Sequence, residues 1–237
     1  MHTTHKLALI TGASRGLGLA LARSLAKTGW HLLLTARNAH ELYVVQQELS
    51  LLTAVTAISG SVTDEIHLLE LPERIEQMGK LDLVVNNAST LGISPQPRLL
   101  DYPVSVLHTL FHTNLIAPLS LLQKVWPHLN SDATVIQISS DAGVAAYPGW
   151  GGYGASKAGL DHLTAILAKE HPEKFIYAYD PGDMRTQMHQ EAFPGEDISD
   201  RPLPETHAVP GVLALLEQRP PSGRYLHSDP TFVPVSL

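Results

Sequence analysis

Apolar runs of strand length alternate with amphipathic stretches of helix length along most of this 237-residue sequence. Alternation of this kind is typical of repeated βαβ units, in which parallel strands form a sheet and helices connect them. Runs such as residues 81–85, Leu-Asp-Leu-Val-Val, are almost continuously apolar, which indicates that helices cover both faces of the sheet. The sequence therefore predicts an α/β fold with a doubly wound parallel sheet.

The same pattern sets the boundaries of the expected elements. We expect strands at residues 6–10, 31–35, 54–58, 81–85, 134–139, 175–179 and 223–226. We expect helices at residues 17–28, 39–51, 64–78, 103–129, 151–170 and 206–217, the fourth broken near Pro118. Residues 181–205 are rich in proline and acidic residues and only weakly periodic, so we predict a substrate loop there. The length suits a single domain over residues 1–237.

Composition excludes several classes of function. Hydrophobic residues make up 44% of the chain, charged residues 16%, and the formal net charge is -7. An acidic chain with scattered lysines and arginines is poorly suited to nucleic acid, so we expect no nucleic-acid partner. The sequence contains no cysteine, which rules out disulfides and thiolate metal sites. Residues 7–10 are too short an apolar stretch for a signal peptide or membrane span, so we expect a cytoplasmic protein without a membrane partner.

A glycine-rich turn stands between the first expected strand and the first expected helix. Residues 11–18 read Thr-Gly-Ala-Ser-Arg-Gly-Leu-Gly. Such glycines let the backbone turn sharply and approach a pyrophosphate, while the helix N-terminus offers free N–H groups to the anion. The place of the turn between strand and helix indicates a dinucleotide-binding fold of the Rossmann type. The residues expected to contact the cofactor here are Gly12, Ser14, Arg15, Gly16, Leu17 and Gly18.

The residues after the second expected strand indicate which dinucleotide binds. An acidic side chain at this place would bind the ribose hydroxyls of NAD, but the chain reads Thr-Ala-Arg-Asn at 35–38 and has no carboxylate before Glu41. Arg37 and Arg15 instead supply guanidinium groups, whose fork geometry suits a 2'-phosphate. The sequence therefore favours NADP(H) over NAD(H).

Tyr153 and Lys157 lie four residues apart at the start of an expected helix, in the segment Tyr-Gly-Ala-Ser-Lys. This spacing places both side chains on one face of the helix. An ammonium group close to a phenol stabilises the phenolate and lowers the tyrosine pKa toward the range of a general acid or base. The pair alone is a common spacing, so it indicates catalysis only together with other motifs.

Several motifs in order resemble those of the short-chain dehydrogenase/reductase family, over about residues 6–186. The glycine-rich turn is similar to the family's Thr-Gly-x-x-x-Gly-x-Gly, and residues 86–89, Asn-Asn-Ala-Ser, are similar to its Asn-Asn-Ala-Gly. Ser140 precedes Tyr153 by thirteen residues, which is the family's spacing between its serine and its tyrosine. Residues 181–186, Pro-Gly-Asp-Met-Arg-Thr, resemble the family's Pro-Gly turn and the threonine that contacts the nicotinamide end.

The resemblance implies an oxidoreductase that transfers hydride between a nicotinamide and a carbonyl or alcohol substrate, of the ketone, aldehyde or 3-oxoacyl type. Tyr153 would be the general acid in reduction and the base in oxidation, and Ser140 would hydrogen-bond the substrate oxygen. Lys157 would hold the nicotinamide ribose and lower the tyrosine pKa, while Asn114 would anchor a water in the proton relay. The same resemblance implies a homodimer or homotetramer, joined through the helices that carry Asn114 and Tyr153.

Further cofactor contacts are implied by the resemblance, and two positions depart from the family pattern. Ser89 replaces a glycine, and Ser61 stands where an aspartate commonly meets the adenine amine, although its hydroxyl can still accept a hydrogen bond. The implied cofactor contacts beyond the glycine-rich turn are Arg37, Ser61, Val62, Asn87, Ala88, Tyr153, Lys157, Pro181, Gly182, Met184 and Thr186.

Other interpretations stay open beside this one. The fold could serve a non-catalytic NADP(H)-binding sensor or scaffold, or a reductase of a ring C=N bond such as that of a pterin. His108 and His112 have a spacing that can bind a metal, but the sequence offers no evident third ligand nearby, so we expect no metal. The residues that could line an apolar substrate pocket are Leu91, Tyr147, Trp150, Met184 and Met188.

Overall fold

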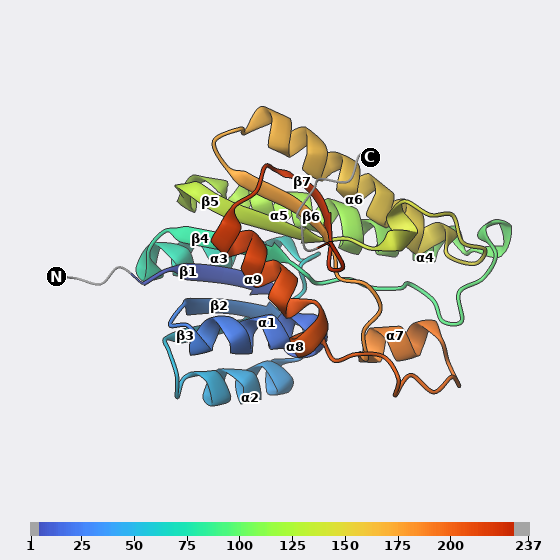
Figure 1. Ribbon diagram of the computed structural model, residues 1–237, viewed down its shortest axis with the longest axis horizontal. Coiled ribbons are helices and arrows are strands. Elements are labelled where there is room, and N and C mark those ends of the chain that lie inside the picture. Colours follow the sequence, from blue (N-terminus) through green and yellow to red (C-terminus); the bar gives the residue numbers. More distant parts are fainter. Residues whose placement is uncertain (1–4, 230–237) are drawn as a thin grey trace.

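The computed structural model describes residues 5–229, which form a seven-stranded parallel sheet (Figure 1). The strands are β1 (Leu7–Thr11), β2 (His31–Ala36), β3 (Val55–Ser59), β4 (Leu81–Asn86), β5 (Leu129–Ile138), β6 (Phe175–Asp180) and β7 (Gly223–Leu226). Their order across the sheet is β3-β2-β1-β4-β5-β6-β7. The chain builds the sheet outward from β1 to β3 and then crosses to β4 on the other side of β1, so the strand order reverses between β1 and β4. Ligands of open α/β sheets bind at such a switch point.

Strand β1 shows how the sheet is buried on both faces. Leu7 and Leu9 pack into the apolar core on one face, while Ala8 and Ile10 pack into the core on the other. Successive side chains of a strand point to opposite faces, so a strand covered on both sides must be apolar at every position. The predicted doubly wound parallel sheet is confirmed.

Two layers of helices cover the sheet. Helices α1 (Gly16–Lys27), α2 (Ala39–Leu49), α8 (Pro204–His207) and α9 (Val209–Gln218) lie on one face. The other face carries α3 (Glu65–Met78), α4 (Val104–Phe111), α5 (Ala117–Val125) and α6 (Gly151–Glu170). Helix α7 (Gln187–Ala192) lies apart from both layers (Figure 1). Short 3-10 turns lie at Leu99–Asp101, Trp126–His128 and Asp141–Gly143.

Two differences from the predicted boundaries have physical causes. Strand β5 begins at Leu129, five residues before its predicted start, because polar residues continue the strand beyond the apolar run. Near Pro118 the α-helix is interrupted, as predicted, but by a π-helical turn at His112–Ile116, so the helical stretch continues from Val104 to His128. Pro118 lies in the first turn of α5, where a missing N–H disturbs a helix least.

The predicted substrate loop at 181–205 contains helix α7, which the sequence pattern did not indicate. One and a half turns of mostly polar sequence give too few apolar repeats for a helical period to stand out. The loop is held at its base by a backbone hydrogen bond from Arg185 to Pro202 at 2.8 Å. It therefore forms an ordered flap over the carboxyl end of the sheet.

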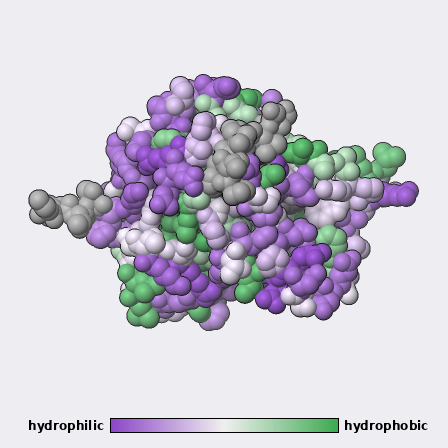
Figure 2. Space-filling model, in the orientation of Figure 1, coloured by the Kyte–Doolittle hydropathy of each residue, from purple (hydrophilic) through white to green (hydrophobic). Residues whose placement is uncertain are grey.

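Within residues 5–229, the helical stretch Val104–His128 is long and apolar enough to cross a membrane by length and composition alone, with a mean hydropathy of 1.2. In the fold, its inner side packs on the sheet through Leu121, Leu122 and Val125. An apolar inner face of this kind is what a helix covering a sheet requires. The surface shown in Figure 2 is largely hydrophilic, with scattered apolar residues.

Candidate active site

A cavity of about 960 Å³ opens at the carboxyl ends of the strands, where the loops after β1 and β4 face each other. Loops after β2, β3, β5 and β6 complete its wall. The predicted site residues that line it are Gly12, Ser14, Arg15, Gly16, Leu17, Arg37, Ser61, Val62, Asn87, Ala88, Ser140, Tyr153, Lys157, Pro181, Gly182, Met184 and Thr186. Gly18 and Asn114 stand behind this lining and contact residues that belong to it.

The glycine-rich turn has the shape that a pyrophosphate site requires. Gly12 and Gly16 have φ angles of 65° and 56°, in the left-handed region that glycine adopts without strain. A Cβ at Gly18 would overlap the carbonyl oxygen of Gly12, so a side chain there would force the turn apart. The N-cap residue Arg15 makes no side-chain cap to α1, which leaves the N–H groups of the first helical turn available to an anion. These residues fit a dinucleotide.

Asn87 holds the glycine-rich turn against the end of β4. Its side-chain amide donates to the carbonyl oxygens of Thr11, at 2.9 Å, and Gly12, at 3.2 Å. In return, the Thr11 hydroxyl accepts from the backbone N–H groups of Asn87 and Ala88, both at 3.0 Å. The sequence predicts Asn87 only as a cofactor contact, and the structure adds a role in shaping the turn.

Arg15, Arg37 and Glu41 lie at the adenosine end of the cavity. Arg37 lines it with an exposed side chain, and Arg15 donates to Gln187 of α7 at 2.7 Å. Glu41 accepts a hydrogen bond from the Ser14 hydroxyl at 3.0 Å. Two guanidinium groups at this end suit a phosphate, which they can bind through paired charge-assisted hydrogen bonds.

Ser61 and Val62 line the same end of the cavity, in the loop after β3. The Ser61 hydroxyl shares a hydrogen bond of 2.8 Å with the hydroxyl of Thr63 and accepts from the Thr63 N–H at 3.3 Å. The loop is thereby held by its own side chains. A hydroxyl group stands here in place of the family's carboxylate.

Tyr153 and Lys157 meet on one face of α6 at the inner end of the cavity. They are 7% and 3% exposed, and the Lys157 Nζ lies 5.6 Å from the centre of the Tyr153 ring. The same Nζ donates to the carbonyl oxygen of Ile138, at the end of β5, at 2.6 Å. These contacts fix the ammonium group beside the phenol, as the four-residue spacing predicts.

Burial dominates the electrostatics of Tyr153. Desolvation raises the pKa of the phenol, and the hydrogen bond with Ser140 opposes that change without cancelling it. The negative charges of Asp180 and Asp141 raise this pKa further. The sequence predicts a lowered pKa for Tyr153, and this prediction is wrong for the protein without its cofactor. The pKa is raised because the loss of hydration outweighs the hydrogen bonds that stabilise the phenolate.

The same burial acts on Lys157 in the opposite direction. Desolvation lowers the pKa of its ammonium group to about 8, although Asp161 and Asp180 act to raise it. At neutral pH the lysine therefore stays mostly charged while the tyrosine keeps its proton. This combination suits a proton donor with a cation beside it.

Ser140 lies at the end of β5 and lines the cavity. Its hydroxyl donates to the carboxylate of Asp141 at 3.0 Å and accepts from the N–H of Ala142 at 3.2 Å. Its neighbour Ser139 is 2% exposed, and therefore far less accessible to a substrate. Both serines line the cavity, so the choice of Ser140 stays a prediction from the thirteen-residue spacing.

Asn114 connects the cavity wall to α6 from within the π-helical turn. Its amide group donates to the Thr90 carbonyl at 2.8 Å and the Ser156 hydroxyl at 3.1 Å. Its oxygen accepts from the Ser89 hydroxyl at 3.1 Å and the Thr90 N–H at 2.9 Å. These four hydrogen bonds occupy the side-chain amide of Asn114. The backbone carbonyl of Asn114 lacks the usual helical donor, because Pro118, four residues later, has no N–H.

Arg224 in β7 is a buried arginine that the sequence analysis missed. It is 4% exposed and donates to Asp161 and Asp180, both at 2.9 Å, and to the carbonyl oxygen of Ser140 at 3.0 Å. Asp180 in turn accepts from the N–H of Gly182 at 3.0 Å. Arg224 therefore joins the last strand to three segments that carry site residues. A lone arginine in a short strand gives no signal of this, because its acidic partners are distant in sequence.

An apolar wall borders Tyr153 at the inner end of the cavity. Leu91, Trp150 and Met188 pack with Tyr153 in one cluster, and the rings of Trp150 and Tyr153 meet edge on with centres 5.8 Å apart. Met184, which is 8% exposed, also lines the cavity. The apolar pocket proposed from the sequence therefore has four of its five residues in place.

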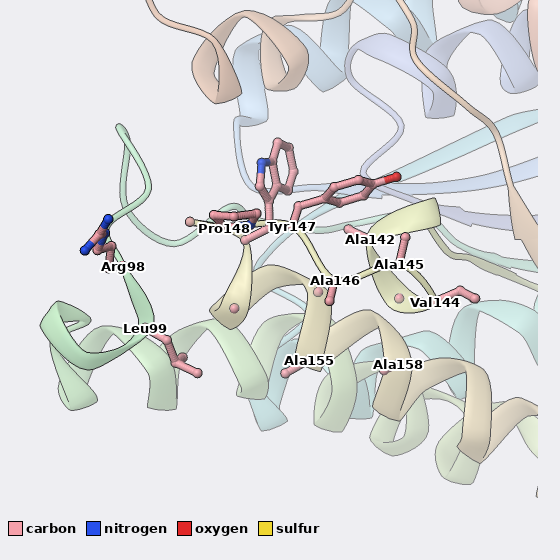
Figure 3. A pocket seen from close by; sticks show the side chains of 15 residues that line it. Arg98, Leu99, Ala142, Val144, Ala145, Ala146, Tyr147, Pro148, Ala155 and Ala158 are labelled. Atoms are coloured by element: carbon pink, nitrogen blue, oxygen red, sulfur yellow. The ribbon is translucent and has the colours of Figure 1, made fainter.

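The fifth residue, Tyr147, lies outside this cavity. It lines a second hollow of about 600 Å³ on the other side of the segment between Ser140 and α6, together with Arg98 and Leu99 (Figure 3). The Tyr147 hydroxyl donates a hydrogen bond to the carboxylate of Asp141, which lines the first cavity, at 2.9 Å. Proximity to Tyr153 in the sequence is misleading here, because the chain reverses between the two residues.

The strand order, the glycine-rich turn at the switch point and the Tyr153–Lys157 pair beside it define a dinucleotide-binding oxidoreductase. The family model for short chain dehydrogenases matches residues 6–197. The chain belongs to the short-chain dehydrogenase/reductase family, which binds a nicotinamide cofactor.

Relatives and solved structures agree with this assignment. A short-chain dehydrogenase/reductase from Cladobotryum sp is 33% identical over 193 residues, covering 77% of this chain and 72% of the relative. A benzil reductase from Saccharomyces cerevisiae that forms (S)-benzoin is 33% identical over 198 residues, covering 78% of this chain and 74% of the relative. The structure of a Shigella flexneri short chain dehydrogenase complexed with NADP has a TM-score of 0.87 at 26% identity, covering 93% of this chain and 95% of that chain. The resemblance stated from the sequence is confirmed.

Proposed function

We propose that this chain is an NADPH-dependent reductase of a carbonyl compound, which runs in reverse as an alcohol dehydrogenase. The observation that carries the proposal is that Ser140 and Tyr153 line the same cavity as the glycine-rich turn. A nicotinamide held from that turn would face a substrate oxygen bound by these two hydroxyl groups. The intact set of Asn114, Ser140, Tyr153 and Lys157 argues against a non-catalytic sensor, which needs no proton donor.

In this mechanism the bound cofactor supplies a hydride to the carbonyl carbon. When the substrate binds, the Ser140 hydroxyl turns its proton from Asp141 to the carbonyl oxygen and stabilises the negative charge that develops there. Tyr153, which holds its proton at neutral pH because burial raises its pKa, donates that proton to the same oxygen. The Lys157 ammonium group, beside the phenol ring, stabilises the phenolate that remains.

The proton that Tyr153 gives up must return from solvent. Lys157 is a charged donor 5.6 Å from the centre of the phenol ring, and the π-helical turn supplies a further polar group. Pro118 cannot supply the usual helical donor to the Asn114 carbonyl, and we assign this oxygen to hold a water of the relay. Asn114 thus acts through its backbone, while its side chain fixes the position of the turn.

NADP(H) is the cofactor that the adenosine end favours. Arg15 and Arg37 bring two guanidinium groups to this part of the cavity. No acidic side chain occupies positions 35–38, and Glu41 accepts a hydrogen bond from Ser14. The NADP bound to the Shigella flexneri relative supports the same choice.

A homodimer or homotetramer completes the proposal. The helices that carry Asn114 and Tyr153 expose apolar side chains on their outer sides, among them Ile116 at 46% and Ile166 at 40%. A second copy packed on this face would remove that surface from water. Light scattering on the purified protein should give a molar mass of two or four chains. A mass near that of one chain, 25.7 kDa, would contradict the proposed assembly.

The reductase proposal is tested by mixing the protein with NADPH, or separately NADH, and a panel of ketones, aldehydes and 3-oxoacyl compounds. The loss of nicotinamide absorbance reports turnover. Benzil belongs in the panel because of the yeast relative's activity. A pterin with a ring C=N bond completes the panel. Tight NADPH binding without turnover of any compound would favour a sensor, and turnover confined to the pterin would assign a ring C=N reduction.

A further inference from the structure

The inner end of the cavity offers a substrate an aromatic and apolar surface. Trp150 packs against Tyr153 on one side and against Phe193 on the other, with ring centres 5.8 Å apart in both cases. Leu91 and Met188 belong to the same cluster as Trp150 and Tyr153. Flat surfaces of this kind favour an aromatic group on the substrate through stacking and edge contacts.

The charge at this end is negative. Asp141 follows Ser140 directly, and its carboxylate accepts a hydrogen bond from the Ser140 hydroxyl at 3.0 Å. A carboxylate therefore lies next to the hydroxyl that would bind the substrate oxygen. Within the described chain, the Asp141 carboxylate also accepts from the Ala142 N–H, at 2.8 Å, and from the Tyr147 hydroxyl, at 2.9 Å. All three donors are neutral, so the charge of Asp141 is not compensated by a direct ion pair.

A second carboxylate, Glu191 of α7, lines the cavity and accepts from the neutral side chain of Gln187 at 2.8 Å. Four lysine or arginine side chains line the cavity, and three of them donate to neutral partners. Lys157 donates to the Ile138 carbonyl, Arg15 to Gln187 and Arg185 to the Ser199 carbonyl. The fourth, Arg37, lies at the adenosine end. An anionic group on the substrate would therefore meet two carboxylates.

We propose, on the basis of the reductase function above, that this site takes aromatic ketones or aldehydes that are neutral or cationic and rejects carbonyl compounds that carry a carboxylate, sulfonate or phosphate. Asp141 is the residue that discriminates. The aromatic wall supplies affinity, while the carboxylate beside Ser140 repels an anion without affecting a neutral ring.

Three benzaldehydes that differ only at the para position test this selectivity. They carry a methyl group, a carboxylate or a trimethylammonium group. With NADPH saturating, kcat/KM for the methyl compound should exceed that for the carboxylate by about tenfold or more, the effect of one or two like charges in a partly solvated site. The ratio should fall as salt is added, because salt screens exposed charges.

Because the substituents also alter the reactivity of the aldehyde, the decisive comparison is between protein variants. Asp141→Asn should reduce the methyl-to-carboxylate ratio of kcat/KM several-fold and should lower the relative rate of the trimethylammonium compound. Asp132→Asn is the matched control, because Asp132 lies near the start of β5, at the opposite end of that strand from Ser140. It should leave both ratios as they are in the wild type.

The outcomes separate this inference from the function on which it rests. An unchanged ratio in Asp141→Asn, or a wild-type preference for the carboxylate, overturns the inference while the reductase function stands. Turnover of small aliphatic carbonyl compounds with none of the three benzaldehydes overturns it too. No NADPH oxidation with any carbonyl compound contradicts the reductase function itself. If Asp141→Asn does not fold, the salt dependence of the wild-type ratio still decides, since a ratio insensitive to salt contradicts a charge effect.

Discussion

Arg224 of β7 and Asp180 of β6 form a buried ion pair at 2.9 Å, directly before the Pro181–Gly182 turn. The same guanidinium group binds Asp161 of α6 at 2.9 Å. One arginine therefore pairs with two carboxylates that have been taken out of water, and the buried Lys157 ammonium group interacts with the same two. Breaking such an arrangement on one side leaves uncompensated charge in the interior, which is far more destabilising than the loss of a surface pair.

Arg224→Met should lower the free energy of unfolding by about 3–5 kcal/mol, the loss observed when one partner of a buried ion pair is removed. Urea denaturation followed by circular dichroism measures this change. The control is Arg23→Met, which removes an ion pair with Glu48 at 2.7 Å whose side chains are 39% and 43% exposed. That loss should be about 1 kcal/mol or less. Equal losses in the two variants would contradict the structural role given to Arg224.

Arg37→Gln should weaken NADPH binding by about tenfold or more, because it removes a charge-assisted contact to the 2'-phosphate. NADH, which lacks that phosphate, should bind nearly as in the wild type. Dissociation constants from the fluorescence of the bound reduced nicotinamide measure both. Arg74→Gln, an exposed change on α3, is the control and should alter neither constant. Equal weakening of the two cofactors by Arg37→Gln would remove the argument for NADPH.

The pKa of Lys157, lowered by burial to about 8, predicts a pH dependence of reduction. Above this pH the ammonium group loses its proton, and the phenolate left by proton transfer loses its stabilising cation. Reduction at saturating NADPH should therefore decline as the pH rises through about 8. A pH–rate profile measures this limb. A profile that is flat through this region would show that the lysine charge is not required.

The same lowered pKa makes a prediction about stability. Between about 8 and the ordinary lysine value of 10.5, the folded chain has released this proton while the unfolded chain still holds it. Stability rises with pH wherever the unfolded state binds more protons. The free energy of unfolding of the wild type, relative to Lys157→Met, should therefore increase from pH 8 toward pH 10 in urea titrations. A constant or decreasing difference would contradict the buried setting of Lys157.

The sheet could be predicted from the sequence because double burial leaves a strong signal. Runs such as the one at β4 are apolar on both faces, and the turn after β1 combines glycines with a strand before and a helix after. Helix α7 and the π-helical turn could not be predicted in this way. Both depend on tertiary contacts, such as the bonds from Asn114 to Ser156, that leave no local period in the sequence.

Residue types and spacing were enough to bring most of the candidate site together, but not to set its electrostatics. Tyr153 and Lys157 share a helix face as their spacing predicts, yet the pKa of the tyrosine rises because burial is a property of the whole fold. Tyr147 shows the converse, since it is close to Tyr153 in sequence and lines a different hollow. Arg224 was missed because its partners come from other strands and helices.

The central claim is that Tyr153 donates the proton in an NADPH-dependent reduction. Its most direct test is the single-turnover rate of NADPH oxidation, with a carbonyl compound turned over by the wild type, in Tyr153→Phe. The rate should fall by about 100-fold to 10,000-fold, the usual contribution of a general acid, while the NADPH affinity stays close to that of the wild type. A rate near that of the wild type in a variant that still binds NADPH would contradict the mechanism.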